Sequence, residues 1–116
     1  MILGIVGYRN FTDYEFLSQQ VNEFLAEHGK VTQIISGGCQ GADTLAEQYA
    51  TEHGIPFKVF LPDDRIKNNS KFAKRDKEIA QECTHLLAFP STKGKGAQLT
   101  INFAKELKRV VFIHWV

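Results

Sequence analysis

Five short apolar runs alternate along the chain with four longer stretches in which apolar residues recur at helical spacing. The apolar runs cover residues 2–6, 32–36, 57–61, 85–89 and 110–115, and the helical stretches cover 14–28, 42–53, 71–82 and 99–107. A helix between two strands returns the chain to the end of the sheet where the first strand began, so that the strands run parallel. The alternation therefore predicts one α/β domain over residues 1–116, in three layers, with a mainly parallel sheet of about five strands and helices on both faces.

The bulk composition argues against several classes of protein. Hydrophobic residues make up 43% of the 116 residues, which is enough for the core of one domain. With 14 Lys and Arg against 13 Asp and Glu, the net charge is +1, so nucleic acid is not an expected partner and any basic site must be local. No apolar run approaches the roughly 20 residues that span a bilayer, and the start of the chain has no leader pattern. No membrane association is expected.

Cysteine and histidine are placed without the spacing of a metal site or a redox pair. We therefore expect no metal, no cofactor and a cytoplasmic, reducing location. One of the two cysteines, Cys39, precedes a predicted helix, where a thiolate is favoured. Because no histidine nearby could act as its base, we do not expect this thiol to be catalytic.

A glycine-rich turn joins the second predicted strand to the second predicted helix and contains Ser36, Gly37, Gly38, Gly41 and Asp43. Glycines let the backbone approach a ligand closely, and the free N–H groups at a helix N-terminus favour phosphate. The turn matches neither the dinucleotide fingerprint nor the P-loop, so it predicts neither hydride transfer nor Mg-ATP hydrolysis. Asp43 has two interpretations: it caps the helix, or it accepts a hydrogen bond from a sugar hydroxyl.

Two further loops follow predicted strands, and they contain Gly7, Tyr8 and Arg9 after the first strand and Gly94 and Gly96 after the fourth. Because the carboxyl ends of parallel strands meet at one edge, we expect all three loops to converge there, together with residues 62–65 after the third predicted strand. Arg9 would bind a phosphate or carboxylate, and Tyr8 or the nearby Phe11 would stack on a base. The alternatives are a surface arginine, core aromatics and a mobile loop, and the sequence leaves them open.

The densest basic segment spans residues 65–77. Its lysines are most simply a solvated helix face, whereas Arg75 is the stronger candidate for a ligand contact. If the protein is an enzyme, a carboxylate must stabilise the reacting centre or activate water, and the weak candidates are Asp43 and Asp63. The final strand candidate at 110–115 is aromatic, and we expect a homodimer or a higher homo-oligomer.

Taken together, these segments resemble a known family over essentially the whole chain. Residues 7–13 read Gly-Tyr-Arg-Asn-Phe-Thr-Asp and match the pattern G-S-R-x-[FW]-x-D; residues 37–43 read Gly-Gly-Cys-Gln-Gly-Ala-Asp and match G-G-A-x-G-A-D. Pro62-Asp63, the helix segment 73–76 and the loop 88–97 continue the pattern in order. The chain thus resembles the SLOG superfamily, specifically its small YspA-type branch.

The resemblance implies a Rossmann-like domain that binds a nucleotide or a nucleotide-derived ligand of the ADP-ribose kind, as a signalling or signal-sequestering protein. Relatives in the superfamily include DprA and the phosphoribohydrolases that release cytokinin bases. The ligand contacts that the resemblance implies are Gly7, Arg9, Gly37, Gly38, Gly41, Asp43, Arg75 and Gly96.

Departures from the family pattern help to rank the possible functions. Tyr8 stands where the branch usually has serine, Cys39 where it has alanine, and Asp76 where it has asparagine. The P-G-G-x-G-T-x-x-E motif of the phosphoribohydrolases is absent. Binding without turnover is therefore our first hypothesis. The alternatives are an N-glycosidase or phosphoribohydrolase acting on nucleotides and a DprA-like binder of single-stranded nucleic acid.

Overall fold

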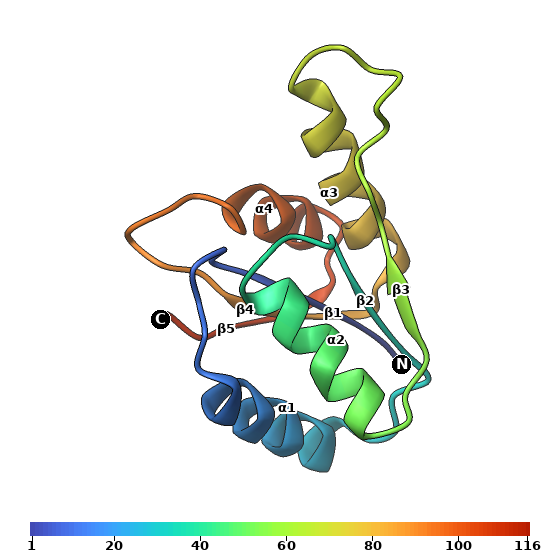
Figure 1. The fold of residues 1–116 in the computed structure, drawn as a ribbon. Coiled ribbons are helices and arrows are strands. Elements are labelled where there is room, and N and C mark those ends of the chain that lie inside the picture. Colours follow the sequence, from blue (N-terminus) through green and yellow to red (C-terminus); the bar gives the residue numbers. More distant parts are fainter.

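The computed structural model describes residues 1–116 and alternates strands with helices from end to end (Figure 1). The strands are β1 (Ile2–Gly7), β2 (Gln33–Ser36), β3 (Phe57–Val59), β4 (His85–Phe89) and β5 (Val110–Ile113). The helices are α1 (Tyr14–His28), α2 (Ala42–Glu52), α3 (Ser70–Glu82) and α4 (Gln98–Glu106). The prediction of an α/β fold with five strands is confirmed, and every neighbouring pair of strands is parallel.

The two edge strands are shorter than the sequence predicts. β3 ends at Val59 rather than at residue 61, where Leu61 is 68% exposed and a proline follows. β5 ends at Ile113 rather than at residue 115, because its register against β4 ends at the pair of Ala88 and Ile113. Apolar side chains alone extended both predictions, whereas ladder pairing sets the real limits.

The strand order is β3-β2-β1-β4-β5, so the chain leaves β1 in one direction and later returns to its other side. Right-handed crossovers then place α1 and α2 on one face of the sheet and α3 and α4 on the other (Figure 1). Ligands of such sheets bind at the carboxyl ends of the strands where the order reverses. Here that point lies between β1 and β4.

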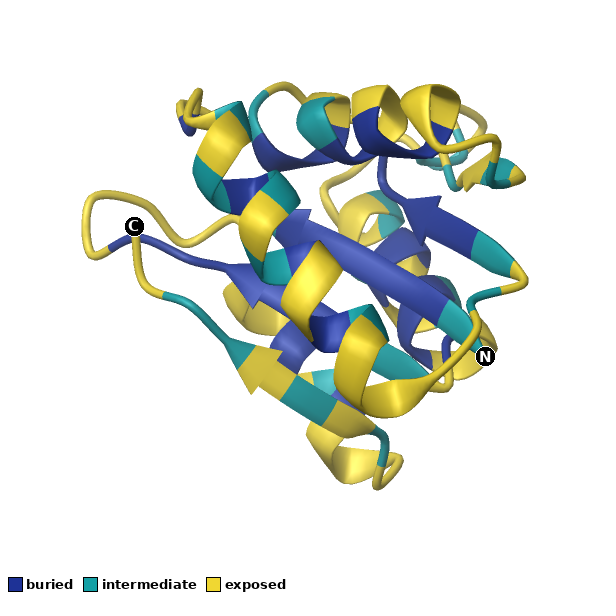
Figure 2. Ribbon diagram, turned by 90° about the horizontal axis from the view of Figure 1, so that it is seen from below, coloured by how far each residue is buried: buried dark blue, intermediate teal, exposed yellow.

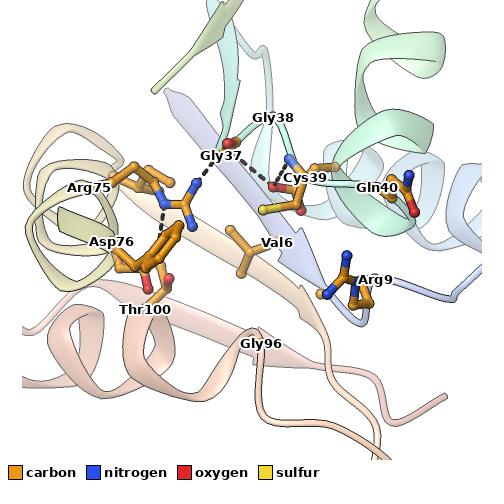
Figure 3. Close-up of a pocket in the computed structure, with 14 residues that line it drawn as sticks. Val6, Arg9, Gly37, Gly38, Cys39, Gln40, Arg75, Asp76, Gly96 and Thr100 are labelled. Atoms are coloured by element: carbon orange, nitrogen blue, oxygen red, sulfur yellow. Dashed lines mark hydrogen bonds and ion pairs between the residues drawn. The ribbon is translucent and has the colours of Figure 1, made fainter. Parts of the chain in front are cut away.

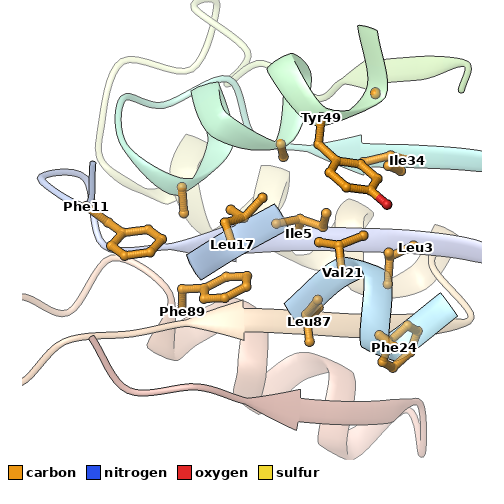
Figure 4. Packing of buried hydrophobic residues seen from close by; sticks show 13 residues of the cluster. Leu3, Ile5, Phe11, Leu17, Val21, Phe24, Ile34, Tyr49, Leu87 and Phe89 are labelled. Atoms are coloured by element: carbon orange, nitrogen blue, oxygen red, sulfur yellow. The ribbon is translucent and has the colours of Figure 1, made fainter. Parts of the chain in front are cut away.

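Each face of the sheet carries its own buried core (Figure 2), and alternation along β1 supplies both. Leu3 and Ile5 point into the cluster under α1 and α2 (Figure 4), while Val6 belongs to the cluster under α3 and α4. β4 alternates in the same way, with Leu87 on the first face and Leu86 on the second. Packing on both faces fixes the ends of β1 and β4, which carry two of the predicted loops.

None of the four helices is both long and apolar enough to cross a membrane.

Candidate functional site

The loops after β1, β2 and β4 converge at the carboxyl edge of the sheet, as predicted. The Tyr8 N–H donates to the Phe89 carbonyl at 2.9 Å, and the Ala42 N–H donates to the Tyr8 carbonyl at 3.3 Å. The end of β1 is therefore bonded to the end of β4 and to the start of α2. Gly7 allows this approach, because a Cβ there would lie 2.6 Å from the Phe89 carbonyl oxygen.

Gly41 stands directly before α2 and is required by its backbone. Its φ is +79°, and a Cβ on it would lie 2.3 Å from the Tyr8 carbonyl oxygen and 2.5 Å from the Arg9 carbonyl carbon. Any side chain would therefore force the loops after β1 and β2 apart. This contact fixes where the N-terminus of α2 lies relative to β1.

A cavity of about 580 Å³ opens between these loops and the helices α3 and α4 (Figure 3). Its volume is in the usual range for small-molecule sites, roughly 300–1,000 Å³. Seven of its lining residues are among the predicted ligand contacts: Gly7, Arg9, Gly37, Gly38, Asp43, Arg75 and Gly96. The other seven are Val6, Cys39, Gln40, Phe72, Asp76, Ile79 and Thr100.

Asp43 closes the glycine-rich turn onto the first turn of α2. Its Oδ2 accepts hydrogen bonds from the Gly37 N–H at 2.9 Å and from the Cys39 N–H at 3.3 Å. Burial raises the pKa of this carboxyl to about 6, against the opposing effect of the hydrogen bonds and of the Arg75 charge. These bonds are not a helix cap, because the N-cap of α2 is Gly41 and no side chain caps that helix. They come from the turn before the helix and hold the turn in one shape.

Arg75 and Asp76 form a buried ion pair in the cavity wall. Arg75 Nε donates to Asp76 Oδ1 at 2.7 Å, and Arg75 Nη1 donates to the Gly37 carbonyl at 2.7 Å. Both side chains are less than 10% exposed, and burial raises the pKa of Asp76, although the Arg75 charge opposes the shift. The pair thus ties α3 to the glycine-rich turn at Gly37, beside the carboxylate of Asp43.

Arg9 is the arginine of the cavity that has no partner. It is exposed and forms no ion pair and no side-chain hydrogen bond, in contrast to Arg75. Figure 3 shows Arg9 and Arg75 on opposite sides of the cavity with Val6 between them. A guanidinium without a counter-ion at the edge of a concave site attracts an anion.

The family model of the YspA, cpYpsA-related SLOG family matches residues 1–65. This chain belongs to that family. The SLOG match spans β1 to the residues just after β3 and so contains both Arg9 and the glycine-rich turn. No curated protein matches the chain.

Two solved structures share the fold with this SLOG chain. One is an X-ray structure of TM1055, a structural-genomics target, with a TM-score of 0.69 and 21% identity over 95% of this chain and 71% of that one. The other is DNA processing protein A (DprA) from Streptococcus pneumoniae, with a TM-score of 0.75 and 18% identity over 96% of this chain. The present chain spans 49% of DprA, about half its length.

Several residues that the sequence singled out lie outside the cavity lining: Tyr8, Ser36, Gly41, Gly94 and Asp63. Ser36 is fully buried, and its hydroxyl donates to the Ile5 carbonyl at 2.8 Å. Asp63 pairs with Arg65 at 2.9 Å, and that guanidinium lowers its pKa to about 2.

Of the two aromatic residues considered for base stacking, Phe11 is 8% exposed and stacks on Phe89 with ring centroids 5.6 Å apart. Phe11 is therefore a core residue, which is the second of the two alternatives that the sequence left open. Tyr8 is half-buried and accepts a hydrogen bond from Asn10 at 3.3 Å.

Sequence reasoning missed one stripe of α3. Residues 72, 75, 76 and 79 recur at i, i+3, i+4 and i+7, and all four line the cavity. Of these four residues, only Arg75 was predicted as a ligand contact, and Asp76 was noted as a departure from the family pattern. The signal was present: Phe72 is the one large apolar residue in the first turn of an otherwise polar helix.

Proposed function

We propose that this protein binds a phosphorylated, nucleotide-derived small molecule in the cavity. One observation carries the proposal: Arg9, which has no acidic partner, lines a concave site that also contains glycine backbone from the loops after β1, β2 and β4. Membership of the SLOG family supports it, because six of the eight ligand contacts implied by the resemblance fall on the matched segment, and only Arg75 and Gly96 lie beyond it.

Unbonded backbone donors mark where a phosphate would bind. Asp43 occupies the N–H groups of Gly37 and Cys39, but those of Gln40 and Gly41 form no hydrogen bond. The N–H of Gly96, two residues before α4, is also without a partner. Three donors on residues that line the cavity are thus free for an anion: the amides of Gln40 and Gly96 and the guanidinium of Arg9.

Binding without turnover fits the carboxylates of the site better than glycosidic cleavage does. Asp63 lies outside the lining, Asp76 is paired with Arg75, and Asp43 is 6% exposed with its Oδ2 bonded to two loop amides. A general acid or base needs an oxygen that can reach the substrate, and burial works against this at Asp43. The finer assignment, an ADP-ribose-like signal that the protein senses or sequesters, is part of the same proposal.

Isothermal titration of wild type, Arg9→Ala and Arg65→Ala with AMP, ADP-ribose and a cyclic dinucleotide tests the proposal. Wild type should bind at least one of them, and Arg9→Ala should weaken that binding by about 2 kcal/mol, roughly 30-fold. Arg65→Ala is the matched control, since Arg65 is an exposed arginine outside the cavity. It should leave the affinity unchanged.

Two outcomes would contradict the proposal. Wild type would bind none of the compounds, or Arg9→Ala would bind as wild type does. Salt-dependent binding of a single-stranded oligonucleotide without any nucleotide binding would favour the DprA-like alternative instead. Release of a free base from a bound nucleotide, abolished by Asp43→Asn, would favour the glycosidase.

A further inference from the structure

The cavity has an apolar part as well as a basic one. Of its 14 lining residues, Phe72 is the only aromatic one. It lies one turn before Arg75 on α3, whereas Arg9 comes from the loop after β1 on the other side of the cavity (Figure 3). A ligand that reaches from Arg9 to the start of α3 would meet charge at one end and a phenyl ring at the other.

Phe72 is more exposed than the other large apolar residue of the same stripe of α3. It is 42% exposed, while Ile79, two turns further along the same stripe, is fully buried. The ammonium of Lys71 lies 5.3 Å from the centroid of the Phe72 ring and 3.5 Å from Asp64. The ring is therefore partly held in place while much of it stays exposed. Because the side chain is already restrained, a ligand that stacks on it would lose less free energy to side-chain ordering.

The apolar surface continues from the cavity onto the end of β3. A Cβ on Gly38 would lie 2.6 Å from a methyl carbon of Val59 and 3.0 Å from one of Leu61, so both side chains pack against the glycine-rich turn. Val59 is 38% exposed and Leu61 is 68% exposed. Gly38 lines the cavity, and these two side chains thus form an apolar border beside it.

The aromatic residues proposed from the sequence are not available in the same way. Phe11 is buried against Phe89, and Tyr8 lies outside the lining with its ring 3.0 Å from where a Cβ on Gly94 would be. A base that enters this cavity therefore has one ring on which to stack.

We propose that Phe72 is the stacking surface for an aromatic base, so that the ligand is a nucleotide with its base attached rather than a sugar phosphate. The phosphate then lies toward Arg9 and the N-termini of α2 and α4, and the base lies toward α3. This inference rests on the proposed function, because it concerns the same cavity, and it assigns the recognition of the base to a residue outside the matched family segment.

AMP and ribose 5-phosphate share a phosphate and a ribose, so the difference between their affinities measures the contribution of the base. Wild type should bind AMP about 10-fold more tightly than ribose 5-phosphate, which is the usual order of one base–aromatic stack. Phe72→Leu keeps apolar bulk but removes the ring, and it should lose this preference while ribose 5-phosphate binds as before. Phe72→Tyr should retain the preference. Leu107→Ala, an exposed apolar site at the far end of α4, is the control and should change neither affinity.

Equal losses for AMP and ribose 5-phosphate in Phe72→Leu, or no loss for AMP, would overturn the inference. In either case binding of ribose 5-phosphate that depends on Arg9 would leave the proposed function standing. If wild type binds neither of these compounds, the inference fails; if it also binds neither ADP-ribose nor the cyclic dinucleotide, the proposed function fails with it. A thermal melt of each variant, expected to match wild type, shows that the change lies in binding.

Discussion

The loop after β2 and the loop after β4 both join a strand to a helix and both contain glycines, yet their backbones are held in different ways. In the first, Gly38 and Gly41 have φ values of +73° and +79°, and Asp43 accepts two hydrogen bonds from the loop amides. In the second, neither Gly94 nor Gly96 has a positive φ, and residues 92–96 are all exposed.

The difference teaches that a glycine pattern between a strand and a helix has two physical meanings. In the first loop glycine is needed for a backbone that other elements contact from two sides, so this loop is a fixed wall of the cavity. In the second loop the glycines leave room and freedom, and such a loop can adjust to a ligand at the cost of ordering it. The predictions below test this distinction.

Gly41→Ala should have the largest effect. The new Cβ would meet the Tyr8 carbonyl oxygen at 2.3 Å, and φ at Gly41 is positive. Strain and overpacking together should lower the free energy of unfolding by about 4 kcal/mol. At Gly96 a Cβ would be 3.7 Å from the Gly7 carbonyl oxygen, an ordinary contact, so Gly96→Ala should cost less than about 0.5 kcal/mol. Urea denaturation measures both.

Gly29→Ala separates the two parts of the Gly41 effect. Gly29 ends α1 with φ of +98°, and a Cβ there would have nothing within 4 Å. Its cost should therefore be strain alone, about 2 kcal/mol. A loss at Gly41 no larger than that at Gly29 would show that the loops after β1 and β2 can move apart, and the first loop would not be a fixed wall.

Asp43→Asn should change how stability depends on pH. The folded pKa of Asp43 is raised by burial to about 6 from the usual 3.8, so the folded state holds this proton more tightly than the unfolded chain does. The contribution of Asp43 is therefore greatest below the unfolded pKa and is lost as pH rises to about 6. Relative to Asp43→Asn, wild type should lose about 2 kcal/mol between pH 4 and pH 7.

Denaturation curves of both proteins at several pH values measure this difference. Asp76, whose pKa is also raised by burial, is present in both and cancels. Asp63→Asn is the control: Arg65 lowers the pKa of Asp63 to about 2, so any effect falls below pH 4. A constant difference between wild type and Asp43→Asn from pH 4 to pH 7 would mean that the carboxylate in the first loop is not held as the structure has it.

The fold could be predicted from the sequence because its central strands have a clear hydrophobic pattern. β1 and β4 are buried on both faces and therefore read as continuous apolar runs, and each helix between strands shows a one-sided apolar stripe. The edge strands were predicted less well, since β3 and β5 are half-exposed and their ends depend on pairing with a neighbour rather than on their own residues.

The site could be predicted only where it is local in sequence. The glycine-rich turn and Arg9 are carried by short segments, so their types and spacing were visible. The roles of Arg75 and Asp76 were not, because they depend on a contact with the Gly37 carbonyl 38 residues away. Phe72 stands out in the first turn of a polar helix, but it was missed as a cavity residue because its own segment does not show that the loops after β1 and β2 lie opposite it.

Gly94→Ala should have a small effect on the free energy of unfolding, and the size of that effect should depend on one neighbour, Tyr8. A Cβ there would lie 3.0 Å from Cε1 and 3.1 Å from Cδ1 of Tyr8, with no positive φ to strain the backbone. The ring can shift, so the cost should be about 1 kcal/mol. In a Tyr8→Ser background that ring is gone, and Gly94→Ala should be neutral or stabilise by about 0.4–1 kcal/mol through the unfolded chain.

A double-mutant cycle on Tyr8 and Gly94, followed by urea denaturation, should therefore give a coupling of about 1 kcal/mol. Wild type, Gly94→Ala, Tyr8→Ser and the double variant complete the cycle. An equal cost of Gly94→Ala in both backgrounds would mean that the backbone of the second loop itself requires glycine, as that of the first does. Both loops would then have a backbone fixed by glycine, and α3 would be the remaining part of the cavity wall that could adjust to a ligand.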